Sequence, residues 1–358
     1  MKLKLSLPDH SYDIVIERGS LETIGQWVAK LWERQKIVLI TDKNVARQYL
    51  DIVKKSLEKA GFSLGIYIIE PGEKSKTLES AAAIYDFLAQ EGLTRSDGII
   101  ALGGGIVGDL GGFVASTYMR GIHFLQVPTS LLAQVDSSIG GKTALNTRRA
   151  KNLIGTFAQP DGVLIDPDTL KTLDKSHIRE GIAEIIKAAA IGDKRLWDKL
   201  ENIQDEDDLL ENIDEIILDS CIVKRDLVQE DEFDHGIRLY LNFGHTIGHA
   251  LEKISGFNSL SHGQGVAIGM KQITRVSEEK GQTRKGTWLA LKQMIEKFGL
   301  GLFPDKWPIE EIYQAINHDK KTRGSRLKLT LLEEIGKAKS HTIPIDDVKD
   351  YLVRGEES

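Results

Sequence analysis

The stretch GIIALGGGIVGDLGGFVA at residues 98–115 decides the fold of this chain. Its first six residues are apolar or small without alternation, which is typical of a strand buried on both faces of a parallel sheet. Gly103, Gly105 and Gly108 then match the pattern G-x-G-x-x-G, and residues 109–116 can continue as a helix. Backbone without side chains at a helix N-terminus lets phosphate groups approach the peptide N–H groups closely. The stretch therefore predicts a Rossmann-like α/β domain with a phosphate-binding turn.

Segments on both sides of this stretch repeat the order of strand and helix. Residues 3–7 and 12–17 alternate with period two, which predicts a pair of strands, and residues 78–92 have the pattern of a helix. The continuous apolar segments that predict further buried strands are 36–41, 64–70 and 122–128. Because strands and helices alternate along the chain, we expect a mainly parallel sheet with helices on both faces.

The strand signal fades after residues 162–170, and long amphipathic segments follow. The segments that predict helices are 178–191, 208–229, 244–254 and 284–298. We therefore expect an NAD-binding α/β domain over residues 1–172 and a mostly α-helical domain over residues 173–358. An active site is expected in the cleft between the two domains, beyond the carboxyl ends of the strands.

Composition limits the class of protein. The chain has 358 residues, 41% of them hydrophobic and 28% charged, which fits a globular protein of two domains. Its net charge of −6 argues against nucleic acid or an anionic membrane as partner. Cys221 is the single cysteine, so no intrachain disulfide is possible, and a reducing cytoplasm fits. The N-terminus lacks the apolar core of a signal peptide, and we expect no membrane partner.

The glycine turn alone is a weak signal for a dinucleotide. The acidic residue that usually ends the following strand is missing, because that strand ends in Val127 and Pro128. Two interpretations stay open at this point. The motif is only a tight turn, or the ribose is held from elsewhere, by Asp42 and Asn44 after an earlier strand or by Glu73.

A second signal comes from histidines in the predicted helical domain. His245 and His249 are four residues apart in NFGHTIGH, and His262 follows a short loop in SLSHGQG. Glu184 lies on a predicted helix upstream. A single histidine is as well explained by packing in the core, but three within 18 residues, beside glycines, favour a metal site. One carboxylate with two or three imidazoles would leave coordination positions open for a substrate hydroxyl.

A third signal is a set of cationic and amide side chains. Surface lysines are usually solvated, so each member alone carries little weight. Lys142 on a glycine turn, and Arg238 four residues before Asn242, have more specific settings. The other members are Lys151, Asn152, Lys224, Lys320 and Lys321. Such a set suits a substrate that carries both a phosphate and a carboxylate.

Five stretches together resemble the 3-dehydroquinate synthase family of sugar-phosphate cyclases. They are ALGGGIVGDLGGFVASTYMRGIHFLQVPTSLLAQVDSSIGGKTALN, KNLIGTFAQP, EIIKAA, LNFGHTIGHALE and HGQGVAIGM. The resemblance implies a lyase of the shikimate pathway, in aromatic amino acid biosynthesis, that uses NAD and a divalent metal, zinc or cobalt. It implies conversion of 3-deoxy-D-arabino-heptulosonate 7-phosphate into 3-dehydroquinate and phosphate, through transient oxidation, β-elimination, reduction, ring opening and an intramolecular aldol reaction.

The resemblance also implies roles for single residues. Glu184, His245 and His262 become the metal ligands, and His249 becomes a substrate-side group. The positions implied to contact NAD are Asp42, Asn44, Glu73, Lys76, Gly104, Gly105, Ile106, Asp109, Thr129, Ser130, Leu132, Asp136, Lys142, Lys151, Thr169, Thr172 and Leu173. The substrate-pocket positions are Asp136, Lys142, Lys151, Asn152, Lys187, Lys224, Arg238, Asn242 and one of Lys320 and Lys321.

Arg120 matches a residue that reaches the pocket of a neighbouring subunit, which implies a homodimer. Asp234 departs from the family, where glutamate is common, and its reach is about one methylene shorter.

Three other functions remain to be weighed. The chain could be a related cyclase acting on sedoheptulose 7-phosphate, a metal-dependent polyol dehydrogenase, or a nucleotide-binding module without activity. Lys142 and the pair Arg238 and Asn242 favour a substrate with a carboxylate, which sedoheptulose phosphate lacks.

Overall fold

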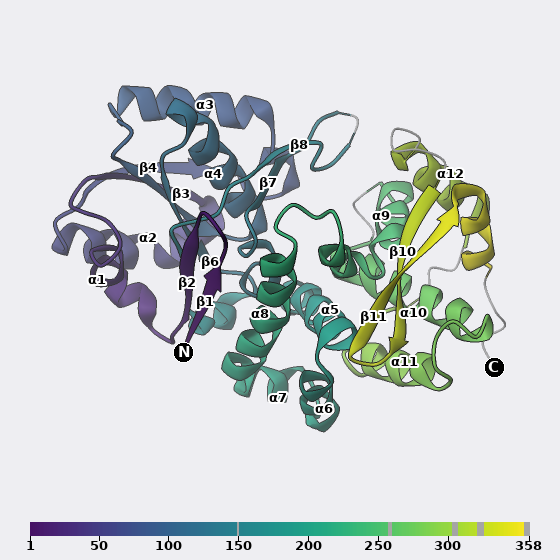
Figure 1. Cartoon of the computed structure of the whole chain (residues 1–358). Helices are drawn as coiled ribbons and strands as arrows, with labels where there is room; N and C mark the ends of the chain where they lie inside the picture. Colours follow the sequence, from purple (N-terminus) through teal and green to yellow (C-terminus); the bar gives the residue numbers. More distant parts are fainter. Residues whose placement is uncertain (149, 257–259, 303–306, 321–325, 354–358) are drawn as a thin grey trace. The chain divides into compact units, whose positions relative to one another are not determined.

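The chain forms two compact units in a computed structural model (Figure 1). They are Met1–Asp174 and Lys175–Ser358. The residues that the structure describes are 1–148, 150–256, 260–302, 307–320 and 326–353.

A seven-stranded sheet forms the centre of the first unit, in the order β1-β2-β9-β6-β5-β3-β4. The strands β1 and β2 pair in antiparallel fashion, and every other neighbouring pair in this sheet is parallel. The strand bounds are β1 Lys2–Ser6, β2 Ser11–Ile16, β3 Lys36–Asp42, β4 Ser63–Ile69, β5 Gly98–Gly103, β6 His123–Pro128 and β9 Gly162–Ile165. The predicted α/β class with a Rossmann-like parallel sheet is confirmed.

Helices cover both faces of this sheet (Figure 1). In β3, Val38 and Ile40 belong to the apolar cluster that includes side chains of two helices on one face. Ile37 and Leu39 belong to the cluster on the other face. The helices of the first face are α3 Leu78–Gln90 and α4 Gly105–Thr117, and those of the second face are α1 Ile24–Val28 and α2 Lys43–Lys59. Burial on both faces explains why the strand segments are continuously apolar.

A short hairpin that the sequence did not indicate packs on α4. Its strands are β7 Lys142–Leu145 and β8 Ile154–Phe157, paired antiparallel. A side chain on Gly112 of α4 would place its Cβ 2.6 Å from Cγ2 of Thr143, so the glycine permits the hairpin to approach. The hairpin carries the predicted substrate residues Lys142, Lys151 and Asn152, either in β7 or in its connection to β8.

The second unit is mostly helical. Its helices are α5 Lys175–Gly192, α6 Lys194–Asn202, α7 Glu206–Glu211, α8 Ile213–Glu230, α9 His245–Ile254, α10 His262–Glu279, α11 Thr287–Lys297 and α12 Ile309–Lys320. The single helix predicted over 208–229 is wrong, because the structure breaks it at Asn212, which has φ −99° and ψ 10°. Among the described residues, no helix is long and apolar enough to cross a membrane.

A hairpin of β10 Arg326–Glu334 and β11 Lys337–Pro344 packs on α5 and α10 of the second unit. We did not predict these strands, although the alternation of Leu327, Leu329 and Leu331 with polar residues gives the signal of a half-buried strand. The unit is therefore helical with one two-stranded sheet.

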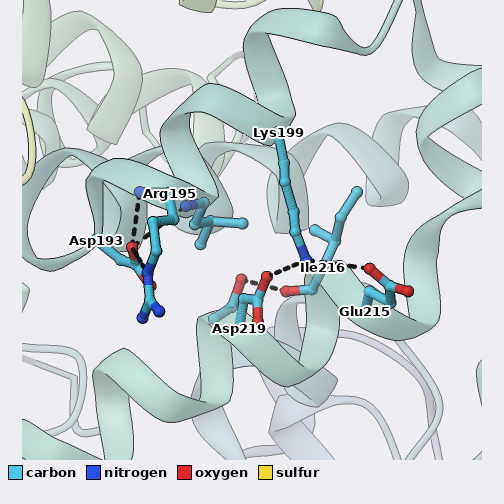
Figure 2. Close-up of polar contacts among 8 residues, drawn as sticks. Asp193, Arg195, Lys199, Glu215, Ile216 and Asp219 are labelled. Carbon is cyan, nitrogen blue, oxygen red and sulfur yellow. Dashed lines mark hydrogen bonds and ion pairs between the residues drawn. The ribbon is translucent and has the colours of Figure 1, made fainter.

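Polar contacts join α6 to α8. Figure 2 shows Lys199 of α6 between Glu215 and Asp219 of α8. Its Nζ atom donates to the two carboxylates at 3.1 and 2.7 Å. The hydrogen bond to Asp219 raises the pKa of Lys199, against a smaller effect of burial. Asp193 caps the start of α6 by accepting from the backbone N–H groups of Arg195 and Leu196. These contacts fix α6 against α8, the helix that carries Lys224.

Asp166 joins the end of β9 to an earlier turn of the first unit. Its side chain is buried and accepts from the backbone N–H groups of Gly19, Leu21 and Asp168 at 3.0–3.1 Å. Asp166→Ala leaves three N–H groups without this acceptor, and we expect a loss of about 2–4 kcal/mol in the free energy of unfolding. Calorimetry would measure it against the helix cap variant Asp193→Ala, for which about 1 kcal/mol is expected. Equal losses would contradict the role of Asp166.

Candidate functional site

Three helices of the second unit meet because glycines remove the side chains between them. A Cβ on Gly269 of α10 would lie 2.0 Å from the carbonyl oxygen of Gly244, the residue before α9. A Cβ on Gly248 of α9 would lie 2.8 Å from the backbone of Gly265 of α10, and one on Gly263 would lie 2.6 Å from Cα of Glu180 in α5. The helices α5, α9 and α10 therefore pack with their backbones in close contact.

This packing brings Glu184, His245 and His262 together. The Nε2 atoms of His245 and His262 lie 3.6 and 3.5 Å from Oε1 of Glu184. Ligand atoms on one tetrahedral zinc ion, at about 2.0–2.1 Å from it, lie about 3.3–3.4 Å apart. Both Glu184 oxygens are buried without an accepted hydrogen bond from any described residue, although Lys187 forms an ion pair with Oε2. The donor set and its spacing fit a divalent metal ion.

Both imidazole rings are oriented by a second contact. Nδ1 of His245 lies 3.1 Å from the carbonyl oxygen of Phe243, and Nδ1 of His262 lies 2.9 Å from Oε1 of Glu252. Because carbonyl and carboxylate oxygens only accept, each Nδ1 carries a hydrogen and donates it. The Nε2 atom is therefore the one available to a metal in each ring.

Glu252 is the residue of this site that the sequence analysis missed. It is 4% exposed and lies on α9, three residues after His249 and seven after His245. That spacing places it on the same helical face as both histidines, which was the available signal.

The electrostatics of the cluster suit a cation. Burial raises the pKa of Glu184, but the charge of Lys187 and the contacts with the two imidazoles lower it by a larger amount, so the pKa lies well below the usual range. Burial, with the charge of Lys187, lowers the pKa of His245 to about 3. Burial also lowers the pKa of His262, but the close contacts of its ring with the carboxylates of Glu184 and Glu252 outweigh burial and raise the pKa to about 10. A metal ion can replace that proton, because two carboxylates remain beside it.

His249 belongs to a second, overlapping set of three possible ligands. Its ring centroid lies 5.2 Å from that of His245 and 5.9 Å from that of His262. Ligand atoms of His249, Glu252 and His262 also lie within 4.8 Å of one another, as do those of the first set. Glu252, however, already binds Nδ1 of His262, and His249 is exposed. We therefore favour the first set and leave His249 beside it.

The other predicted residues of the second unit differ in their exposure. Lys187 and Lys224 are buried, and Arg238 is 1% exposed, with Nη1 donating to the carbonyl oxygen of Glu232. Asn242 is exposed and ends a 3₁₀ turn, Ile237–Asn242, before α9. Asp234 lies in a turn with φ 62°. The side chain of Lys320 and the whole of Lys321 lie outside the described residues.

In the first unit, predicted cofactor residues follow the carboxyl ends of the parallel strands. Asp42 ends β3 and caps α2, where its Oδ1 accepts from the N–H groups of Asn44 and Val45 at 2.8 and 3.1 Å. Asp42 is therefore the N-cap of α2. Gly104 and Gly105 begin α4 after β5. In α/β sheets, ligands bind at this end of the strands.

The remaining predicted residues of the first unit lie in the segments that follow other strands. Thr129, Ser130 and Leu132 follow β6, and Asp136 lies in a π-helical turn, Ala133–Ser137. Thr169 and Thr172 lie in a 3₁₀ turn after β9, where Tyr49 contacts both, and Leu173 ends that turn. Ile106 and Asp109 lie in the first turns of α4, and Glu73 begins a 3₁₀ turn, Glu73–Ser75, just before Lys76. Arg120 is exposed and has φ 71°.

Comparison with known families gives matches over most of the chain. The model described as 3-dehydroquinate synthase N-terminal matches residues 66–180, and that described as 3-dehydroquinate synthase C-terminal matches residues 181–322. A 3-dehydroquinate synthase of Enterococcus faecalis (strain ATCC 47077 / OG1RF) is 58% identical over 354 residues, which cover 99% of each chain.

Solved structures show the same fold. A 2-deoxy-scyllo-inosose synthase, complexed with carbaglucose-6-phosphate, NAD+ and Co2+, superposes with a TM-score of 0.89 at 23% identity, over 98% of this chain and 99% of the other. A 2-epi-5-epi-valiolone synthase from Streptomyces hygroscopicus subsp. jinggangensis 5008, with NAD+ and Zn2+ bound, gives a TM-score of 0.86 at 25% identity, over 97% of each chain.

Replacing a glycine between α9 and α10 by alanine should move His245 away from His262. The displacement should be larger where the added Cβ lies closer to the opposing backbone. We expect Gly269→Ala to lower the free energy of unfolding by about 3 kcal/mol and to weaken Zn2+ binding, because its Cβ meets backbone at 2.0 Å. Gly265→Ala is the matched control, because its Cβ has a nearest contact of 3.1 Å and alanine favours the helix. Urea denaturation and calorimetric Zn2+ titration measure both effects. Equal behaviour of the two variants would contradict the role of the close contact.

Proposed function

We propose, since the chain belongs to the 3-dehydroquinate synthase family, that it converts 3-deoxy-D-arabino-heptulosonate 7-phosphate into 3-dehydroquinate and phosphate. One observation carries the metal-dependent chemistry of this proposal: the Nε2 atoms of His245 and His262 lie within 3.6 Å of the same oxygen of Glu184. The three residues lie on helices whose backbones are in close contact. The reaction makes the protein a carbon–oxygen lyase that eliminates phosphate and closes a carbocycle.

Two cofactors belong to the proposal. Glu184, His245 and His262 would hold a divalent metal, zinc or cobalt, and the glycine turn Gly104–Gly105 with the neighbouring strand ends would hold NAD. When bound, the metal supplies Lewis acidity toward a substrate hydroxyl, and NAD supplies a reversible hydride acceptor. The solved relatives that hold NAD+ with Co2+ or Zn2+ support this assignment.

The side chains of the protein position the substrate and balance its charge. Lys187 and Lys224 are buried cations of the second unit, and Arg238 presents a planar guanidinium that suits a carboxylate or a phosphate. Lys142 and Lys151 supply exposed cations from the β7–β8 hairpin of the first unit. Fixed cations of this kind hold an anionic substrate in one geometry through all steps, which lowers the entropic part of each barrier.

His249 is proposed to act on the substrate side of the metal site. Its ring is exposed, while His245 and His262 direct their Nε2 atoms toward Glu184. An exposed imidazole can accept or donate a hydrogen bond to a substrate hydroxyl close to the metal ligands.

The proposal extends to assembly and location. Arg120 follows Met119, with φ 49°, and precedes Gly121, with φ 119°, so three successive residues with positive φ form a turn that leaves the arginine exposed. We propose that this arginine enters the pocket of a second copy in a homodimer. The net charge of −6 and the single buried cysteine support a cytoplasmic protein without nucleic acid or membrane as partner.

Two alternative enzymes are less favoured. A cyclase acting on sedoheptulose 7-phosphate, or a metal-dependent polyol dehydrogenase, would share the fold and the metal ligands. The identity of 58% to a 3-dehydroquinate synthase, against 25% to a 2-epi-5-epi-valiolone synthase, favours the first function.

The proposed reaction is redox-neutral overall, so NAD+ is needed only in catalytic amount. We expect the protein, with Zn2+ or Co2+ and NAD+ well below the substrate concentration, to release phosphate from the heptulosonate phosphate over many turnovers. A phosphate assay measures the product, and NADH absorbance should not accumulate. Phosphate release from sedoheptulose 7-phosphate alone, or stoichiometric NADH from glycerol-like alcohols, would reject the proposal in favour of an alternative.

Glu252 should tune the metal site through His262. Glu252→Gln keeps an acceptor for Nδ1 but removes the charge, and we expect Zn2+ affinity to fall about tenfold. Glu252→Ala removes the acceptor as well, and a loss of about 100-fold is expected. The matched control is Glu201→Gln, since Glu201 also accepts from a ring N–H, that of Trp197, at 2.7 Å in α6. Calorimetric Zn2+ titration checks the order, and unchanged affinity in Glu252→Ala would contradict it.

A further inference from the structure

The connection between β7 and β8 is tied to the segment around Glu73–Lys76. This connection carries Asn152, which belongs to the proposed substrate pocket, and Lys151, which is proposed to contact both ligands, whereas Glu73 and Lys76 belong to the proposed NAD site. A parallel bridge pairs Thr77 with Asn146, the first residue after β7. Two segments with different proposed ligands therefore share one contact region within the first unit.

Asn146 makes the central contacts of this region. Its Nδ2 donates to Oε1 of Glu73 at 2.7 Å, and its backbone N–H donates to the carbonyl oxygen of Lys76 at 2.8 Å. Its Oδ1 accepts from the backbone N–H of Asn152 at 2.9 Å. A single side chain amide thus bonds the cofactor segment with its donor end and the substrate segment with its acceptor end.

Lys76 closes the same network from the other side. Lys76 is 5% exposed, and its Nζ atom forms an ion pair with Asp109 of α4 and donates to Oδ1 of Asn152 at 2.6 Å. Asn152 has φ 53°, a left-handed conformation that costs free energy for a residue other than glycine. The bonds from Lys76 and to Asn146 hold Asn152 in that conformation.

We propose that Asn146 is a positioning residue that couples NAD+ binding at Glu73, Lys76 and Asp109 to the placement of Asn152. This inference rests on the proposed function for the identity of the two ligands. A dinucleotide that fixes Glu73 and Lys76 restricts Asn146, which then restricts Asn152. Coupling of binding free energies is reciprocal, so the anionic substrate must also strengthen NAD+ binding by the same factor.

The wild-type protein gives a first test that needs no variant. Hydrogen exchange is followed with and without NAD+, in the absence of substrate. We expect NAD+ to slow exchange at the amides of Asn152 and Leu153 themselves, which are not among the residues proposed to contact the cofactor. NAD+ binding without any slowing there would overturn the coupling.

Variants then test the route through Asn146. In Asn146→Ala, NAD+ should still slow exchange around Glu73 and Lys76, but the slowing at Asn152 should be weaker, because only the direct bond from Lys76 to Asn152 remains. A purely structural role would change exchange around Asn152 with and without NAD+ alike. Asn202→Ala is the matched control, because Asn202 also donates from Nδ2, to the carbonyl oxygen of Asp198, but lies in α6 of the second unit. Equal NAD+-dependent slowing around Asn152 in Asn146→Ala and wild type would overturn the assignment.

Substitutions that change the charge at Asn146 and Glu73 test the hydrogen bond between these two side chains. Asn146→Asp keeps the acceptor for Asn152 but opposes a second carboxylate to Glu73, so we expect the Kd for NAD+ to rise about tenfold. Adding Glu73→Gln restores a donor between the two positions, and the double variant should bind NAD+ more tightly than Asn146→Asp alone. An unchanged Kd in Asn146→Asp would contradict the bond as the coupling contact.

These measurements separate the inference from the proposed function. Exchange and NAD+ affinity need no turnover, so they test Asn146 even if the wild-type protein releases no phosphate from the heptulosonate phosphate. If phosphate release is observed, Asn146→Ala should also raise KM for the heptulosonate phosphate more than it lowers kcat. A wild-type protein that fails to bind NAD+ in calorimetry would overturn both the cofactor assignment and the inference.

Discussion

The second unit depends on one constraint, the burial of the Glu184 carboxylate. Glu184 is 2% exposed, and its neighbours Ile182, Ile185 and Ile186 on α5 are fully buried. Transfer of an ionised carboxylate from water to such surroundings costs several kcal/mol unless positive charge or hydrogen-bond donors compensate it. Lys187 supplies one compensating charge from the same helix. His262, the first residue of α10, supplies a second while its ring is protonated. His245, the first residue of α9, directs an Nε2 atom without a hydrogen at Glu184 and supplies no charge, so a metal ion held by the three side chains would supply the rest.

The glycines of α9 and α10 follow from this constraint. An imidazole reaches a carboxylate on another helix only when the helix axes are close, and a Cβ at Gly263 of α10 would meet the backbone of α5 at 2.6 Å. A Cβ at Gly248 or Gly269 would meet backbone at 2.8 or 2.0 Å where α9 and α10 pack, which brings the two imidazoles together. Glycine inside a helix costs about 1 kcal/mol relative to alanine. The helices α9 and α10 therefore have a lower intrinsic stability, but they can pack at a shorter distance from each other. The sequence pattern that looks flexible, FGHTIGH with HGQG, instead builds a tightly packed crossing.

Long, regular segments were predictable from the sequence, and short ones were not. The strands β3 to β6 and the cap at Asp42 follow from continuous apolar runs and one well-placed carboxylate, because burial on both faces leaves a strong pattern. The β7–β8 hairpin has strands of four residues, too short for a period to show. The break at Asn212 depends on a local backbone conformation inside an otherwise helical pattern.

In the site, residues with an unusual side-chain type were predictable from the sequence, whereas residues that matter through their contacts were not. Glu184 and the histidines stand out because their chemistry is rare on apolar helices. Glu252 and Asn146 do not, since their importance lies in which atoms they contact: Nδ1 of His262 in one case, and Glu73 with Asn152 in the other. Such contacts join segments far apart in the sequence, and a single sequence gives no distance between them.

Buried ion pairs recur at the proposed ligand positions of both units. Lys187 pairs with Glu184 in the second unit, and Lys76 pairs with Asp109 in the first. A buried ion pair contributes little net stability, because the cost of desolvating both charges offsets their attraction. Stability alone therefore gives a weak reason for lysine at either position. A lysine held by a carboxylate is already desolvated and oriented. Binding of a phosphate or a metal-bound group therefore requires less free energy to order the lysine side chain. The two pairs are therefore best understood as charges held in place for ligands. The free-energy cost of desolvating these charges is met when the protein folds, before a ligand binds.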